Sequence, residues 1–144
     1  MMSTRFKNGM KQLKEIDGDG GEEVIKALED VSPDLGRFIV EFAFGDIYTR
    51  KELSLQEREL ITITSLLTAG GCEPQLEVHI NGSLNVGITP KKIIETFLQC
   101  IPYTGFPRVL NAVFTAKKVF AERNINLSHF DQFSGLLSQR CKIF

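Results

Sequence analysis

The feature that most constrains the fold is the stretch over residues 58–79, which reads RELITITSLLTAGGCEPQLEVH. Its first half keeps apolar side chains at helical spacing. The pair Gly70-Gly71 then ends that helix, because glycine readily adopts the backbone conformation that follows a last helical turn. Pro74 suits the first turn of a second helix. The stretch therefore predicts two consecutive helices that fold back on each other at the two glycines.

Other helix signals recur along the chain. A capping box at 54–57 predicts that the first of these two helices begins near residue 55. Ser-Pro at 32–33 and Thr-Pro at 89–90 each place a capping side chain before a proline, which predicts two more helix starts. Pro102 is expected to break the helix that begins near residue 90. Together with apolar residues spaced three and four apart, these signals predict helices over 22–30, 33–44, 90–101 and 107–123.

The predicted helix that starts at residue 33 carries a stripe rich in aromatic residues. The stripe consists of Leu35, Phe38, Ile39, Phe42 and Ala43. We expect it to pack into the core, since an apolar stripe at helical spacing usually faces the interior. The alternative is that Phe38, Phe42 and Phe44 line a ligand pocket.

These patterns predict an all-α fold of about six or seven helices in a single domain, because no stretch alternates as a strand would. We place the domain at residues 22–126. Residues 1–21 are expected to be an N-terminal arm, loose or a short helix, that ends in a turn at DGDGG. Residues 127–144 form a tail with room for one more helix. Many apolar helix faces on a small chain also predict a homo-oligomer.

Composition, charge and cysteine spacing argue against several functional classes. The formal net charge of the 144 residues is -1, so no bulk field attracts nucleic acid or an anionic membrane. The longest uncharged run, 60–72, is shorter than the roughly 18–20 apolar residues of a membrane span. No apolar run follows the basic residues at the N-terminus, which argues against a secretory signal. Three scattered cysteines predict free thiols in a reducing cytoplasm, and no spacing predicts a metal site.

The candidate chemistry surrounds the two glycines. Gln75 and His79 lie four residues apart and share a face of the second predicted helix. Cys72 precedes that helix, at its positive dipole end. Glu59 lies early in the first helix and comes within reach of His79 if the two helices are antiparallel. A His–carboxylate pair fixes the imidazole tautomer and raises its basicity, which suits a general acid or base.

Structural interpretations compete with these roles. A single histidine on a helix is more often structural than catalytic, and Glu59 alone would be an ordinary solvated carboxylate. Cys72 alone would be a small hydrophobic residue. Asp17 and Asp19 suggest a calcium loop, but the closing position holds a leucine, so a solvated turn is expected there.

Three segments carry a resemblance to a known family. They read FGDIYTR, LSLQERELITITSLLTAGGCEPQLEVHINGSLNVGITPKKIIE and YTGFPRVLNAVFTAKKVFAE. The chain resembles the carboxymuconolactone decarboxylase family, within the alkylhydroperoxidase-like superfamily. The resemblance implies an all-helical fold that assembles into trimers or hexamers, with active sites near subunit contacts.

Peroxidases of that superfamily carry a Cys-x-x-Cys-x-x-x-His signature with an upstream Glu. In this chain the first cysteine is Cys72, the histidine is His79, and Gln75 replaces the second cysteine. A single thiol cannot complete a dithiol–disulfide cycle within the motif, which favours a decarboxylase. One alternative is a thiol-dependent, peroxiredoxin-type antioxidant protein that uses Cys72 with Cys100. Another is a non-catalytic oligomer that binds a small acid.

The resemblance implies a decarboxylase that needs no cofactor and acts on a small carboxylated lactone. His79 is then the predicted proton donor and oxyanion support, and Glu59 tunes it. The predicted substrate-binding residues are Arg58, Arg50, Gln75, Cys72 and Tyr103. The two arginines are assigned to the retained carboxylate, because the planar guanidinium matches two carboxylate oxygens. Arg108 is a weaker candidate for the same role.

Overall fold

The computed structural model describes residues 3–127, and these form helices without a strand, which confirms the all-α prediction. The elements are α1 (Thr4–Ala27), α2 (Pro33–Phe38), the π-helix η1 (Ile39–Ile47), α3 (Leu55–Ala69), α4 (Glu73–Asn85), α5 (Pro90–Thr104) and α6 (Phe106–Glu122). Six α-helices and one π-helix agree with the predicted number. The helix for which the tail has room lies outside the described residues.

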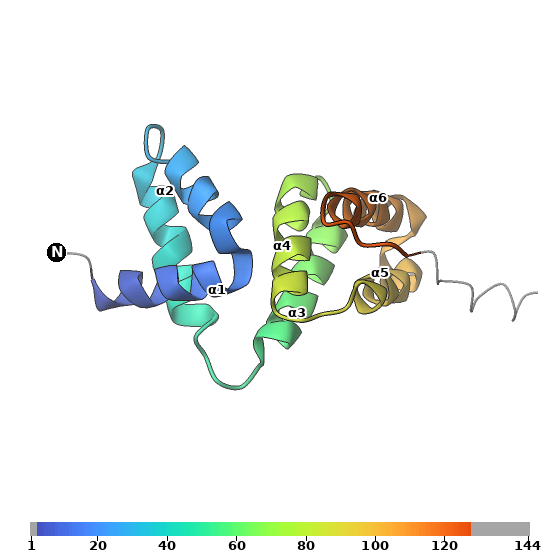
Figure 1. Ribbon diagram of the computed structural model, residues 1–144, viewed down its shortest axis with the longest axis horizontal. Helices are drawn as coiled ribbons and strands as arrows, with labels where there is room; N and C mark the ends of the chain where they lie inside the picture. Colours follow the sequence, from blue (N-terminus) through green and yellow to red (C-terminus); the bar gives the residue numbers. More distant parts are fainter. Residues whose placement is uncertain (1–2, 128–144) are drawn as a thin grey trace, which may run out of the picture.

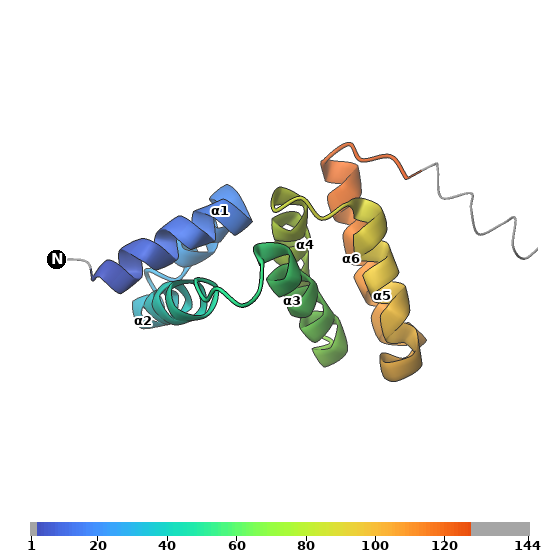
Figure 2. The same ribbon diagram turned by 90° about the horizontal axis from the view of Figure 1, so that it is seen from below.

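The helices form two parts (Figures 1 and 2). In the N-terminal lobe, α1 lies beside α2 and η1. In the C-terminal bundle, α3 and α4 form one pair, and α5 and α6 form a second pair beside it. A loop over 48–54 joins the two parts, which meet where α1 packs on α4. Any site at this junction therefore draws side chains from segments far apart in the sequence.

Each part has its own hydrophobic core. Leu13, Ile16, Val40 and Phe44 fill the lobe. The core of the bundle consists of Ile63, Leu67, Leu76, Ile80, Ile88, Ile93, Phe97, Cys100, Val109, Ala112, Ala116, Val119 and Phe120. Val86 packs against both clusters, so the two cores are joined at one edge.

The N-terminal segment agrees with the prediction in part. The segment Thr4–Ala27 forms α1, which consists of two helical pieces that meet at Gly18, a non-helical residue with φ of 58° and ψ of -139°. Leu13 and Ile16 are buried in the lobe, and this burial stabilises a helix whose sequence is largely polar. Asp17, expected in a solvated turn, is also buried. The break within DGDGG, with a helix on each side, therefore agrees with the prediction, whereas the first helix packs into the lobe and is not a loose arm.

Only part of the aromatic stripe of the second predicted helix packs into the core. Phe38 and Phe42 are 57% and 59% exposed, whereas Val40 and Phe44 are buried. The second half of this segment is a π-helix, in which the Tyr48 N–H donates to the carbonyl five residues earlier at 2.9 Å. Ile39 and Ala43 pack against the core of the lobe as predicted, whereas the prediction was wrong for Leu35, Phe38 and Phe42, which are exposed.

The predicted helix ends are mostly confirmed. Both hydrogen bonds of the Ser54–Glu57 capping box are present at the start of α3. Gly70 and Gly71 have φ values of 71° and 69° and end that helix. Pro102 does not break α5, which continues to Thr104. Pro102 lies in the last turn of α5, two residues before its end.

Within residues 3–127, no helix combines the length and the apolar character that crossing a membrane requires.

Candidate active site

The site is centred on a buried carboxylate that contacts a histidine. Glu59, in α3, is 0% exposed, and its Oε2 lies 3.2 Å from Nδ1 of His79 in α4. This confirms the predicted contact, which follows from the way the two helices fold back at the glycines. With Nδ1 directed at Glu59, the second ring nitrogen, Nε2, is the one left for a ligand.

The pKa of His79 reflects this contact. Burial on its own would lower the pKa of His79, because the protein interior disfavours the charged ring. The hydrogen bond to Glu59 and the negative charge of Glu59 outweigh burial, and Asp17 adds to the shift when it is ionised, so the pKa of His79 is raised. The site therefore favours an imidazolium paired with a carboxylate, and an imidazolium can donate a proton or stabilise a developing oxyanion.

Tyr48 holds the other oxygen of Glu59. Its hydroxyl donates to Glu59 Oε1 at 2.8 Å and lies 2.8 Å from Thr62 Oγ1. Burial and the charge of Glu59 raise the pKa of Tyr48, so this hydroxyl keeps its proton. The ring stacks on Phe44 with centroids 4.9 Å apart. Glu59 is therefore fixed between two donors, one from the loop after η1 and one from α4.

Asp17 adds a second buried carboxyl. It lies on α1 beside the kink, is 8% exposed, and its Oδ1 is buried without a hydrogen-bond partner among the described residues. Burial raises the pKa of Asp17 to about 6; the charge of His79 partly opposes the shift, and the charge of Glu59 adds to it. Asp17, Glu59 and His79 therefore form one electrostatic cluster built from three helices.

Gly82 allows these helices to approach closely. A Cβ atom on Gly82 would lie 2.8 Å from Asp17 Oδ1, 3.0 Å from Ile16 Cγ2 and 3.1 Å from Glu59 Oε2. Both carboxyl groups thus lie against the same point on α4. A residue with a side chain at this position would displace one of them or separate α1 from α4.

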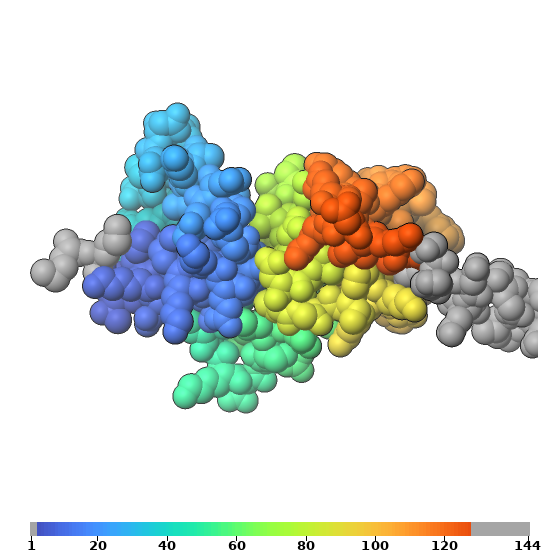
Figure 3. Space-filling model, in the orientation of Figure 1, coloured from blue at the N-terminus to red at the C-terminus, as the bar shows by residue number. Residues whose placement is uncertain are grey.

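A cavity of about 530 Å³ opens beside the cluster. It lies between the N-terminal lobe and the α3–α4 pair, along the seam at which the two parts meet in Figure 3. The polar side chains in its wall are Asp17, Tyr48, Thr62, Gln75 and His79, and the rest of the wall is mainly apolar. A volume of this size accepts a small organic ligand. Glu59 lies behind this wall and acts through its neighbours.

The structure brings only some of the predicted site residues together. Gln75 and His79 line the cavity, whereas Arg58, Arg50, Cys72 and Tyr103 do not. Arg58 is buried, and its Nη2 donates to the Arg50 carbonyl at 2.9 Å, which ties the 48–54 loop to α3. The side chain of Arg50 is exposed.

Other candidates lie elsewhere in the single chain. Tyr103, at the end of α5, is 82% exposed. Cys72 is half-buried, with Sγ 3.5 Å from the Gly70 carbonyl, and Arg108 is exposed beside the same turn. Cys72 and Cys100 are both free thiols. No group of three metal-ligating side chains occurs within residues 3–127.

The sequence analysis did not assign Tyr48 or Asp17 to the site. Tyr48 lies within the FGDIYTR segment, four residues after Phe44, and this spacing on one helix face was the available signal. Asp17 gave no such signal, because only the packing of α1 on α4 buries it.

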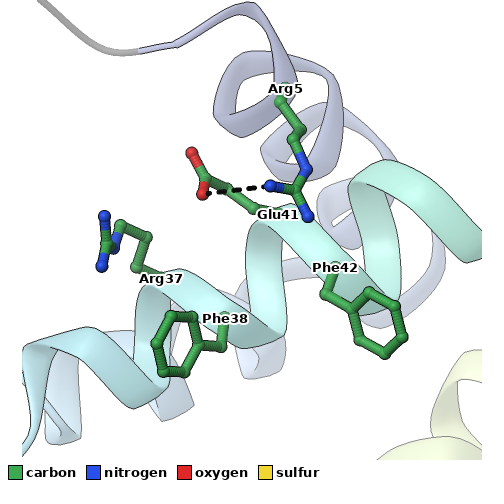
Figure 4. A pocket seen from close by; sticks show the side chains of 5 residues that line it. All are labelled: Arg5, Arg37, Phe38, Glu41 and Phe42. Carbon is green, nitrogen blue, oxygen red and sulfur yellow. Dashed lines mark ion pairs between the residues drawn. The ribbon is translucent and has the colours of Figure 1, made fainter.

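A second hollow, of about 540 Å³, lies on the N-terminal lobe (Figure 4). Its walls are Arg5, Arg37, Phe38, Glu41 and Phe42. Arg5 and Glu41 form an ion pair at 3.9 Å, and the two phenylalanine rings point away from this pair. The hollow contains no histidine or thiol, so we place the chemistry at the first cavity.

The chain is similar in sequence to a known family and to several known proteins. The model of the carboxymuconolactone decarboxylase family matches residues 33–118, which include Tyr48, Glu59 and His79. The chain is 33% identical over 124 residues to a 4-carboxymuconolactone decarboxylase of Acinetobacter baylyi, covering 84% of this chain and 90% of the relative. It is 29% identical over 116 residues to a nitrosuccinic acid decarboxylase of Metarhizium robertsii, covering 78% and 79%. An uncharacterised 15.0 kDa protein of Paracoccus denitrificans is 31% identical over 101 residues, covering 69% and 75%.

Proposed function

We propose that this chain, which belongs to the carboxymuconolactone decarboxylase family, is a decarboxylase for a small activated carboxylic acid of the 4-carboxymuconolactone type. The observation that carries the proposal is the Glu59–His79 pair beside a cavity of about 530 Å³. Two relatives whose names describe decarboxylases support the same class of reaction.

The two named substrates define a chemical class. In 4-carboxymuconolactone and in nitrosuccinate, the reacting carbon bears the carboxylate that leaves and a carboxymethyl group that stays. In both, an acceptor conjugates with the electron pair that remains after loss of carbon dioxide. The acceptor is the unsaturated lactone carbonyl in one case and the nitro group in the other. The substrate class is therefore a succinate carrying an electron acceptor at the reacting carbon, and the reaction needs no cofactor.

The described residues supply the required functions. His79 offers an N–H at Nε2 when protonated, and this donor stabilises the oxygen on which negative charge develops. Glu59 orients the ring and stabilises the imidazolium, and Tyr48 keeps Glu59 in place. Gln75, also in the cavity wall, provides an amide donor for the substrate. The apolar remainder of the wall favours loss of the carboxylate, because it solvates the charged ground state poorly.

We also propose a homo-oligomer, a trimer or hexamer as the family resemblance implies. The exposed side chains of Phe106, Leu110 and Phe114 recur every four residues along α6, and such a stripe favours burial against another subunit. Arg50, Arg58, Cys72 and Tyr103 lie outside the cavity of their own chain, so any substrate contact by them requires a neighbouring subunit. The free thiols of Cys72 and Cys100 fit the reducing cytoplasm, where we place the protein.

The direct test is release of carbon dioxide from 4-carboxymuconolactone, with nitrosuccinate assayed in parallel. His79→Ala should lower kcat by ~10²–10⁴-fold, the usual contribution of a positioned acid or base. His79→Gln, which keeps a polar side chain but cannot carry the positive charge of the imidazolium, should also lower kcat. Near-normal turnover by both variants would remove His79 from the mechanism. Peroxide consumption with a dithiol reductant, without release of carbon dioxide, would point to Cys72 instead.

A further inference from the structure

We propose that Asp17 is the group that returns the proton to carbon after carbon dioxide leaves, a role that rests on the proposed decarboxylase function. Asp17 lies on α1, before residues 33–118, which match the family model. The role divides the acid chemistry between two side chains. His79 stabilises the oxygen that gains charge, and Asp17 protonates the carbon.

The first support is the environment of the carboxyl group itself. Asp17 is 8% exposed, lines the cavity, and has an Oδ1 atom that is buried without a hydrogen-bond partner among residues 3–127. A buried carboxylate without donors is costly, because nothing replaces the water that solvated its charge. A protonated carboxyl avoids most of this cost and can direct its hydroxyl at a ligand in the cavity.

The second support is the contrast with Glu59. Glu59 accepts hydrogen bonds from Tyr48 and contacts His79, so its negative charge has two donors. Asp17 has neither of these two donors, although Asp17 and Glu59 both lie against Gly82. When two carboxyl groups share a site, one ionises and the other retains its proton. Tyr48 and His79 stabilise the negative charge on Glu59, so Asp17 is the carboxyl group that retains its proton.

The titratable groups that act on Asp17 agree with this assignment. They are Glu59 on α3 and His79 on α4. Burial is the largest cause that raises the pKa of Asp17 to about 6, and the charge of Glu59 raises it further while that of His79 opposes the shift. A carboxyl group with a pKa in this range can donate a proton near neutral pH and regain it from water.

The reaction balances with this proton. The bond between the reacting carbon and its carboxylate breaks, carbon dioxide leaves, and the electron pair spreads through the double bond to the lactone oxygen. The pair then forms a C–H bond at the carbon next to the lactone carbonyl, as the O–H bond of Asp17 breaks. Asp17 is left as a carboxylate, which regains one proton from water before the next turnover. The oxygen and the protonated carbon are different atoms, so two separate groups can serve them.

The test compares Asp17→Asn with Asp19→Asn, a matched control two residues further along α1 at an exposed position. With 4-carboxymuconolactone, Asp17→Asn should lower kcat by ~10²–10⁴-fold and leave KM nearly unchanged. The wild-type kcat should fall as pH rises through the pKa of Asp17, and this limb should be missing from the residual activity of Asp17→Asn. Asp19→Asn should match the wild type in both respects.

Solvent deuterium provides a readout that a merely structural role would not change. In deuterium oxide, the wild type should place one deuterium on a single face of the carbon next to the lactone carbonyl. Asp17→Asn should give product with both configurations, because water then delivers the proton without a fixed direction. Circular dichroism and thermal unfolding establish that the variant is folded.

A second measurement is independent of turnover. The difference infrared spectrum between wild type and Asp17→Asn at pH 5 should show the C=O stretch of one protonated carboxyl group, and Asp19→Asn should retain it. If the wild type releases carbon dioxide but Asp17→Asn keeps its rate and its stereochemistry, the role of Asp17 is overturned and the proposed function stands. If the wild type releases none from either substrate, both fall.

Discussion

Nδ1 of His79 lies 3.2 Å from Oε2 of Glu59, and this carboxylate is 0% exposed. A partner that is fully removed from water acts on the imidazole at low dielectric, so its effect is large and poorly screened by salt. The orientation and the charge of His79 therefore both depend on Glu59.

This dependence can be measured by NMR titration of the His79 ring. Glu59→Gln should lower the pKa of His79, because it removes the charge that outweighs burial. The other histidine of the chain, His129, supplies an internal reference, and His79→Ala identifies the resonance. An unchanged pKa in Glu59→Gln would show that the pair does not control the ring.

The hydroxyl of Tyr48 should stabilise the protein through Glu59. Tyr48→Phe removes a donor at 2.8 Å from a buried carboxylate, so the free energy of unfolding should fall by about 1.5–3 kcal/mol. A double-mutant cycle with Glu59→Gln isolates the interaction, and urea unfolding gives the four values. Purely additive effects would mean that the hydroxyl and the carboxylate do not interact.

Gly82 should tolerate no side chain. Gly82→Ala would place a Cβ 2.8 Å from Asp17 Oδ1 and 3.1 Å from Glu59 Oε2, so overpacking should cost about 1–3 kcal/mol of stability. Gly20→Ala is the matched control, since a Cβ on Gly20 meets nothing within 4 Å and the residue is also helical. There, alanine should be neutral or stabilise by up to about 1 kcal/mol. Equal unfolding midpoints for both variants would contradict the close approach of α1 and α4.

The buried carboxyl of Asp17 should make the protein less stable as pH rises. Its pKa is raised to about 6 from 3.8, so between these values the folded state holds a proton that the unfolded chain has released. Stability therefore falls across this window, by up to about 3 kcal/mol in total, and the loss persists above pH 6.

Asp17→Asn should remove this dependence and leave the protein more stable than the wild type at pH 8. Asp19→Asn should keep the wild-type profile, because Asp19 is exposed. Urea unfolding at intervals between pH 4 and pH 8 tests both expectations. Parallel profiles for wild type and Asp17→Asn would show that the carboxyl is not perturbed.

The sequence predicted the helix ends and the contact at the centre of the site. The capping box at Ser54, the two glycines at 70–71 and the prolines at 33, 74 and 90 act through hydrogen bonds and backbone angles within a few residues. Glu59 and His79 were predictable for the same reason, because they lie on consecutive helices joined by a very short turn.

Tertiary structure alone decided the rest of the site. Packing of α1 on η1 buried Val40 and Phe44 and left Phe42 outside, although all three belong to the same apolar segment. From the sequence alone, Asp17 is expected to be a solvated turn residue. In the structure, α1 packs on Gly82 of α4, and this packing places Asp17 beside Glu59. Local patterns determine where helices begin and end, since their hydrogen bonds close within the segment. Burial and charge coupling depend on which distant segment supplies the neighbours, and only the folded chain brings residue 17 to residues 59 and 79.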